Sequence, residues 1–101
     1  MTNPVIEIVN FRLAPGVSAA AFLAEVPASD SFIKAQPGFV ARRLSEGSDG
    51  RWLEHIEWRS MEEAKAASEA IMQEASLAGF MQSFDMESVE MRHQNLHVST
   101  G

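Results

Sequence analysis

The segment from Val5 to Leu13 constrains the fold more than any other part of this sequence, because it is predicted to be a β-strand that is largely apolar on both faces. Its β-branched and aromatic residues are typical of strands, and Pro15-Gly16 ends it as a turn. Side chains alternate along a strand, so one face carries Val5, Glu7, Val9, Phe11 and Leu13 and the other carries Ile6, Ile8, Asn10 and Arg12. Strands of this type are covered on both sides. The fold must therefore supply a cover for each face.

A helix is predicted to begin after Ser18, whose hydroxyl can accept a hydrogen bond from the first turn. Its apolar residues recur with the helical period at Ala19, Phe22, Leu23 and Val26. Proline removes a backbone donor and clashes with the preceding turn, so Pro27 predicts a kink or break at that point. A second helical piece carrying Phe32 and Ile33 then ends at Pro37-Gly38.

The next two strand-like segments are predicted to form a hairpin. They run from Phe39 to Leu44 and from Arg51 to Trp58, with Ser48-Asp49-Gly50 as a turn between them. Ser60 and Glu63 then form a capping box, in which the serine hydroxyl accepts from the Glu63 amide and the Glu63 carboxylate accepts from the Ser60 amide. A second helix should therefore begin there.

The second helical region is predicted to break before it ends. Its inward stripe is small and apolar, at Ala64, Ala67, Ile71, Ala75 and Ala78. Gly79 lies in this region, and glycine costs about 1 kcal/mol relative to alanine inside a helix. We expect a break into two helices near Ala75. Val89 to Val98 is predicted to be the last strand.

The resulting order is β-α-β-β-α-β, which indicates an α+β fold of the ferredoxin-like type. In this fold both helices pack on one face of a four-stranded antiparallel sheet. We expect residues 1–101 to form a single domain of this kind. Because the strands are apolar on both faces, the face without helices needs a partner, and the simplest partner is a second copy of the chain.

The composition excludes several kinds of site and partner. The sequence has no cysteine, which removes thiol nucleophiles, disulfides and thiolate metal sites. Its 14 acidic and 8 basic residues give a net charge of -6, which argues against nucleic acid. The longest apolar stretch, Ala19 to Ala24, is far shorter than the ~20 residues that cross a membrane. No leader segment is visible, so a cytoplasmic location is predicted.

Three segments resemble the antibiotic biosynthesis monooxygenase-like domain, a family of dimeric α/β barrels. They are the first strand with its Pro15-Gly16 turn, residues 36–44 (QPGFVARRL), and residues 50–64, which include RWLE and EWRSMEEA. The resemblance covers nearly the whole chain and implies a closed barrel made from the sheets of a homodimer. Similar domains include cofactor-free oxygenases of aromatic polyketides, haem-degrading monooxygenases and many members of unknown role.

The haem-degrading branch can be tested on this sequence residue by residue. That branch carries an asparagine on the first strand and a tryptophan and a histidine on the second helix. Asn10 lies one residue away from the expected place, and one residue on a strand reverses the face. No histidine occurs between Lys65 and Phe84. The resemblance therefore implies no haem, and we expect no cofactor.

His55 and Asn10 are the predicted catalytic residues. Histidine transfers protons near neutral pH, and Glu57 lies two residues after His55, on the same face of the strand, where it could orient the imidazole. Asn10 and Arg12 share a face and could hydrogen-bond a carbonyl or enolate oxygen. Each of these residues could instead serve the surface or a dimer interface.

The predicted binding residues are Arg12, Trp52, Trp58, Phe22 and Met72. The two tryptophans share a face and could enclose a flat aromatic ligand, although core packing is the competing role. The methionines fit a pocket of adaptable shape. No metal is predicted, because His93 and His97 on one strand lie roughly 13 Å apart, too far to hold one ion.

Two functions remain open from the sequence. One is a homodimeric barrel that binds a compact apolar or aromatic molecule between its helices and sheet and acts as a cofactor-independent monooxygenase. In that chemistry the substrate carbanion reduces O₂, so the protein supplies a base, an oxyanion partner and a dry pocket. The alternative is a non-catalytic ligand-binding or assembly module.

Overall fold

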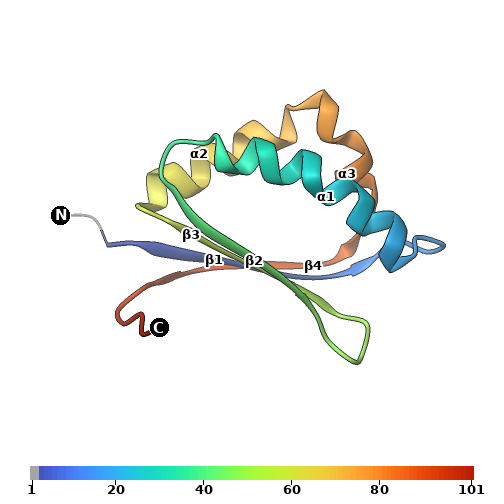
Figure 1. Ribbon diagram of the computed structural model, residues 1–101, viewed down its shortest axis with the longest axis horizontal. Coiled ribbons are helices and arrows are strands. Elements are labelled where there is room, and N and C mark those ends of the chain that lie inside the picture. Colours follow the sequence, from blue (N-terminus) through green and yellow to red (C-terminus); the bar gives the residue numbers. More distant parts are fainter. Residues whose placement is uncertain (1–2) are drawn as a thin grey trace.

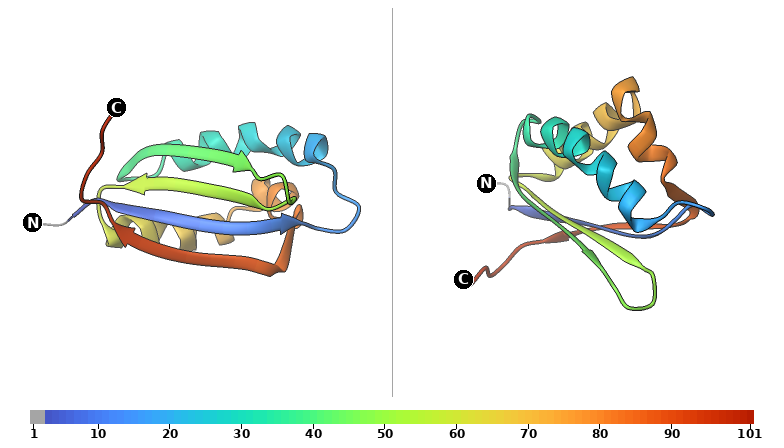
Figure 2. Two further views of the ribbon diagram at one scale, coloured as in Figure 1. Left: turned by 90° about the horizontal axis from the view of Figure 1, so that it is seen from below. Right: turned by 45° about the vertical axis from the view of Figure 1, so that its right-hand side comes forward.

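A computed structural model describes residues 3–101 of the chain (Figure 1). The elements are β1 (Val5–Leu13), α1 (Ala19–Lys34), β2 (Phe39–Glu46), β3 (Trp52–Trp58), α2 (Met61–Met72), the 3₁₀ turn η1 (Ala75–Leu77), α3 (Ala78–Gln82) and β4 (Phe84–Asn95). The strands form one antiparallel sheet in the order β2-β3-β1-β4. Figure 2 shows this order from below, and Figure 1 shows the helices together on one face. The predicted ferredoxin-like α+β fold is confirmed.

Helix α1 runs without interruption through Pro27, so the predicted break there is wrong. The predicted cap is present, because the Ser18 hydroxyl accepts from the Ala21 amide at 3.0 Å. Phe22 and Ile33, on either side of the proline, are both buried against the sheet. Packing at both ends of the helix therefore outweighs the hydrogen bond that proline removes.

The second helical region divides where the sequence predicted. Ser60 caps α2 by accepting from the Glu63 amide at 3.2 Å, and its hydroxyl donates to the Glu63 carboxylate at 3.1 Å. The helix ends at Met72, and η1 and α3 follow. The Ser60 cap and the break near Ala75 are confirmed, but the Glu63 carboxylate accepts from the Ser60 hydroxyl, whereas the prediction gave it the Ser60 amide.

Strand β4 begins at Phe84 and ends at Asn95, so it starts and ends earlier than the predicted strand from Val89 to Val98. Its pairing with β1 shifts register between Asn10 and Arg12, which marks a bulge. There the Arg12 amide donates to the Ser88 hydroxyl at 2.8 Å. A serine side chain thus replaces a backbone acceptor.

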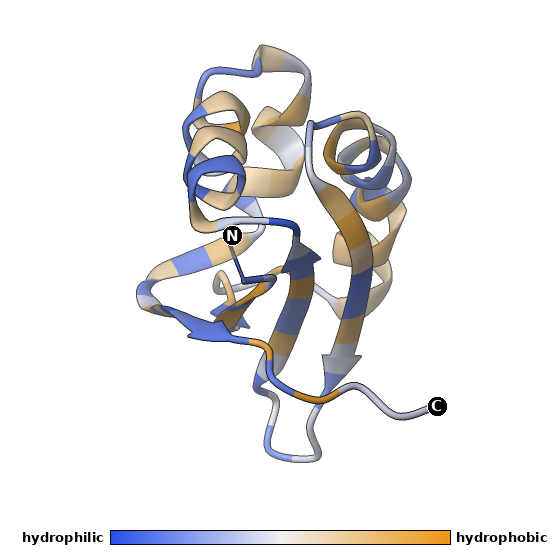
Figure 3. Cartoon of the chain, turned by 90° about the vertical axis from the view of Figure 1, so that its left-hand side faces the viewer, coloured by the Kyte–Doolittle hydropathy of each residue, from blue (hydrophilic) through white to orange (hydrophobic). Residues whose placement is uncertain are grey.

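The core consists of two clusters between the sheet and the helices. The aromatic cluster contains Val9, Phe11, Phe22, Trp52, Leu77 and Phe80. The second cluster contains Ile33, Ile56, Trp58, Ala64 and Ala67. Figure 3 shows apolar and polar residues alternating along strands, as expected when one face of a sheet points to the core.

The apolar side chains on the sheet face away from the helices are less exposed to solvent than the sequence predicted. Ile6 and Ile8 lie on it, yet they are only 6% and 9% exposed in the single chain. Ile6 pairs with Glu57 and Gln94, and Ile8 pairs with His55 and Arg92, so longer polar side chains flank both isoleucines. The second copy that we expected on this face stays a prediction.

Candidate functional site

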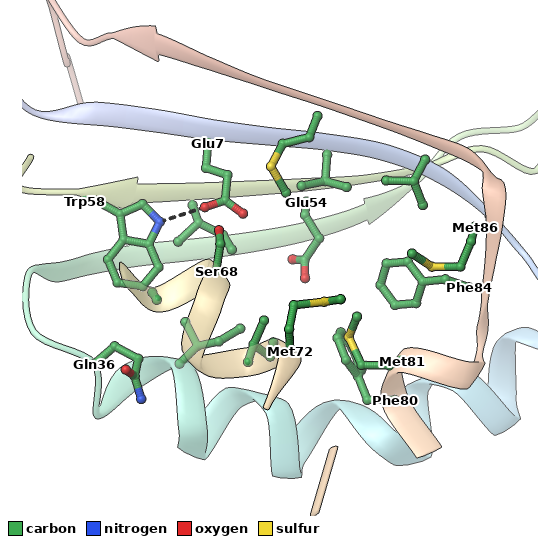
Figure 4. A pocket seen from close by; sticks show the side chains of 17 residues that line it. Glu7, Gln36, Glu54, Trp58, Ser68, Met72, Phe80, Met81, Phe84 and Met86 are labelled. Carbon is green, nitrogen blue, oxygen red and sulfur yellow. Dashed lines mark hydrogen bonds between the residues drawn. The ribbon is translucent and has the colours of Figure 1, made fainter. Parts of the chain in front are cut away.

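A pocket of about 190 Å³ lies where the two core clusters meet, and we call it the helix–sheet pocket (Figure 4). Every element except β2 and η1 contributes side chains, and Gln36 follows α1. The lining residues are Glu7, Val9, Ile33, Gln36, Glu54, Ile56, Trp58, Ala67, Ser68, Ile71, Met72, Phe80, Met81, Phe84, Met86, Val89 and Met91. Most of these side chains are apolar. A mainly apolar cavity with a few polar groups is the usual form of a small-molecule site.

Glu7 is the most unusual group in the helix–sheet pocket. It lies between Val5 and Val9 on the buried face of β1 and is only 7% exposed. Its Oε1 accepts a hydrogen bond of 3.2 Å from the Trp58 indole Nε1. Burial raises the pKa of Glu7 to about 7, the Trp58 hydrogen bond lowers it in part, and the nearby charge of Glu54 raises it further. Glu7 can therefore both take up and release a proton near neutral pH.

Glu54 is a second buried carboxylate in the pocket, but its charge has a partner. Arg42 donates to it from Nε at 3.0 Å and from Nη2 at 2.6 Å. Arg42 also donates to the Ser29 hydroxyl at 3.0 Å and to Asp30 at 3.3 Å. Burial opposes the charged guanidinium, but Glu54 and Asp30 raise the pKa of Arg42 above its usual value. The two pocket carboxylates thus have different environments, and only Glu7 lacks a cationic partner of this kind.

His93 lies beside Glu7 at the edge of the sheet. The two residues pair directly across β1 and β4, and His93 Nε2 lies 3.9 Å from Glu7 Oε1. Nε2 is buried and has no hydrogen-bond partner among residues 3–101. Burial, together with the charge of Lys65, lowers the pKa of His93. A neutral imidazole therefore lies next to the protonatable carboxylate.

Methionines line one side of the helix–sheet pocket. Met72, Met86 and Met91 line it and are 68%, 57% and 50% exposed, and Met81 lies beside them. Their unbranched thioether side chains adapt to ligands of different outline. The adaptable shape of the pocket stays a prediction.

The structure separates the predicted site residues into three groups. Trp58 and Met72 line the helix–sheet pocket. Trp52 and Phe22 are packed against each other in the aromatic cluster, with ring centroids 5.0 Å apart, and they do not line the pocket. Trp52 and Phe22 therefore support the pocket wall from behind.

The third group, His55, Asn10 and Arg12, lies on the opposite face of the sheet. His55 and Ile8 are direct partners there, and His55 borders a separate surface hollow that includes Glu57. Arg12 donates to the Asp49 carbonyl at 2.9 Å. None of the three lines the helix–sheet pocket, and their predicted roles stay predictions. Within residues 3–101 no group of three or more side chains is arranged to hold a metal ion.

Glu7 and Glu54 were not singled out from the sequence. A signal for Glu7 was available, because it is the one charged residue on the buried face of β1, among Val5, Val9 and Phe11. An acid placed in this way is either buried or marks an exposed face, and the alternation alone does not decide which. The structure decides that it is buried.

Comparisons with known proteins show which solved structures share this fold. No protein-family model matches the chain, and no curated protein matches it. Among solved structures, a candidate antibiotic biosynthesis monooxygenase from Bordetella bronchiseptica is 15% identical, with a TM-score of 0.79 over 96% of this chain and 100% of that one. A similarly named protein from Caulobacter crescentus is 14% identical, with a TM-score of 0.76 over 96% of this chain and 92% of that one.

SnoaB, a cofactor-independent oxygenase from Streptomyces nogalater, is 14% identical, with a TM-score of 0.65 over 99% of this chain and 97% of that one. Identities this low establish similarity of fold only. No helix of residues 3–101 is long and apolar enough to cross a membrane.

Proposed function

Because the chain has the fold of the antibiotic biosynthesis monooxygenase-like domains, we propose that it is a cofactor-independent monooxygenase acting on a compact apolar or aromatic molecule. The single observation that carries this proposal is Glu7, a buried carboxyl with a pKa of about 7 inside an otherwise mainly apolar pocket. A general base is most effective when its pKa lies near the working pH. The electrons that reduce O₂ would come from the substrate.

The reaction requires a substrate with an acidic methylene beside a carbonyl or aromatic ring. Glu7 removes one C–H proton, and the carbanion reduces O₂ and forms a C–O bond. Glu7 returns that proton to the outer oxygen, which gives a hydroperoxide. Glu7 then removes the second C–H proton, the C=O bond forms as the O–O bond breaks, and the leaving hydroxide takes the proton as water. The balance is one CH₂ plus O₂ giving one C=O plus H₂O.

The other lining residues have supporting roles in this proposal. The Trp58 indole holds the Glu7 carboxylate towards the pocket, beside α2 (Figure 4). Ser68 on α2 also lines the pocket, and in this proposal its hydroxyl donates a hydrogen bond to the enolate oxygen of the substrate. The Gln36 amide is already used, because it donates to the Phe32 carbonyl at 3.2 Å. The methionine side chains admit flat rings of differing width.

This assignment moves the catalytic base from His55 to Glu7 and the enolate partner from Asn10 to Ser68, because Glu7 and Ser68 line the helix–sheet pocket and His55 and Asn10 do not. The homodimer belongs to the proposal, with the sheet face of Ile6, Ile8 and His55 as the contact surface. The cytoplasmic location stays a prediction. The competing function, a non-catalytic ligand-binding module, would use the same pocket without proton transfer.

Anthrone is a suitable probe, because its methylene lies between two rings and opposite a carbonyl. Purified protein is incubated with anthrone under ¹⁸O₂, and label in the anthraquinone is measured by mass spectrometry against a protein-free blank. Glu7→Gln should lower turnover at least about 100-fold, since a general base contributes roughly that much. Glu57→Gln, the same change on the other sheet face, is the matched control and should retain turnover.

Binding of anthrone is followed separately by quenching of tryptophan fluorescence. Binding without ¹⁸O incorporation above the blank would favour the ligand-binding module. Equal turnover by the wild type and Glu7→Gln would remove Glu7 from the mechanism.

A further inference from the structure

We propose that His93 is a positioning residue for Glu7. The His93 imidazole accepts the Glu7 proton at the edge of the sheet and releases it to solvent while the helix–sheet pocket is occupied. This inference rests on the proposed role of Glu7 as the base. It concerns a residue outside the lining of the pocket.

The strand pairing fixes the two side chains against each other. Glu7 and His93 are direct partners in the antiparallel ladder between β1 and β4, so they project from the sheet on the same side. The oxygen nearest to the imidazole is Oε1, which also accepts from the Trp58 indole. Oε1 therefore has both an N–H donor and the His93 ring near it.

The Nε2 atom of His93 is the most informative detail. Buried polar atoms are nearly always paired, and an exception requires an explanation. Nε2 has no partner within residues 3–101, and at 3.9 Å from Oε1 it is about 1 Å beyond hydrogen-bond distance. A small rotation of either side chain closes that gap. An unprotonated Nε2 is then the acceptor for the proton of Glu7.

The position of His93 supplies an exit for the proton. Glu7 is 7% exposed, and a ligand in the helix–sheet pocket covers it further from that side. Strand β4 is an edge strand, and the His93 side chain is 19% exposed although its Nε2 is buried. The exposed part of the ring can therefore pass a proton to water without opening the pocket.

Burial and one nearby charge keep the imidazole neutral. Burial of His93, together with the charge of Lys65 on α2, lowers its pKa. Glu54 on β3 acts on Glu7, and Arg42 on β2 compensates Glu54. Trp58 completes the groups that face the pair. When the proton moves from Glu7 to His93, it leaves a carboxylate beside an imidazolium, and the attraction between these opposite charges lets the two groups share one proton.

Proton sharing is tested first without any ligand. NMR titration follows the Glu7 carboxyl carbon and the His93 ring nitrogens in the wild type, in His93→Gln and in the control His97→Gln, whose residue is exposed beyond β4. Each group should show an inflection at the midpoint of the other in the wild type. His93→Gln should remove that second inflection and change the proton concentration at which Glu7 is half-protonated by at least threefold. His97→Gln should leave the Glu7 and His93 curves unchanged. A Glu7 curve identical in all three proteins would overturn the proposal.

The role in turnover is tested by its dependence on pH. His93→Gln should lower anthrone oxidation about tenfold at pH 6, where Glu7 must lose a proton first, and less than twofold at pH 8.5, where it is already ionised. An equal loss at both pH values would indicate a merely structural role and would contradict the proposal. If the wild type does not oxidise anthrone, the proposed function fails, whereas the NMR titration still decides whether the proton is shared.

Discussion

The Trp58 indole nitrogen donates a 3.2 Å hydrogen bond to Glu7 Oε1, which joins the end of β3 to the first part of β1 inside the helix–sheet pocket. This bond favours the ionised carboxylate, whereas burial favours the neutral acid. The balance between these two effects keeps the pKa of Glu7 near neutrality.

Trp58→Phe should raise the pKa of Glu7. The phenyl ring preserves most of the packing but removes the donor, and a hydrogen bond to a charged group contributes enough to raise proton affinity by roughly tenfold. The measurement is the pH midpoint of the Glu7 carboxyl carbon by NMR. Trp52→Phe is the control, because Trp52 packs in the aromatic cluster and does not contact Glu7 through such a bond. An unchanged midpoint in Trp58→Phe would contradict the assignment.

Glu7 should make the protein less stable as the pH rises from 4.5 to about 7. In this range the folded protein holds the proton that the unfolded chain has released, so the free energy of unfolding falls with pH. The full effect is about 3 kcal/mol, present below pH 4.5 and lost above pH 7. Glu7→Gln should abolish this component, and urea unfolding at several pH values measures it. A difference between the two proteins that is constant with pH would show that the Glu7 pKa is not raised.

Arg42→Met should destabilise the protein by about 3–5 kcal/mol, because it leaves the Glu54 carboxylate buried without its partner. The double variant Arg42→Met with Glu54→Leu should recover most of that loss, since it removes both charges. Urea unfolding of the wild type, both single variants and the double variant gives the coupling energy. Additive effects in that cycle would mean that the ion pair contributes nothing specific.

His55→Ala and Asn10→Ala discriminate between the two faces of the sheet. The sequence-based prediction gives at least a tenfold loss of turnover in these variants. The pocket proposal gives less than a twofold change, because both residues lie on the face away from the helices. Anthrone oxidation measured beside light scattering decides between them and shows whether the oligomeric state changes. A tenfold loss with the oligomeric state unchanged would move the reaction to the His55 face.

The fold was predictable because its signals are local. The bounds of β1, the caps at Ser18 and Ser60 and the break near Ala75 each depend on residues within a few positions of one another. The start of β4 was missed for the opposite reason. At the β1 bulge, Ser88 replaces a backbone acceptor through a bond to Arg12, a contact between residues 76 positions apart.

The candidate site was less predictable, because it depends on which face of the sheet the helices cover. His55 and Glu7 each share a strand with apolar neighbours, and the sequence does not say which of them is buried. Histidine was favoured for its ordinary pKa near neutrality, whereas Glu7 acquires such a pKa only through burial. Trp58 was predicted to bind a ligand, with core packing as the competing role, and it both lies in the core and lines the pocket.

The residues around the helix–sheet pocket lie on the face of the sheet that the helices cover. The proposed dimer pairs through the opposite face, so each polypeptide in it would keep a chamber of its own. Saturation should require one guest molecule for every polypeptide, and pairing two chains through the opposite sheet face would double the number of chambers without merging them.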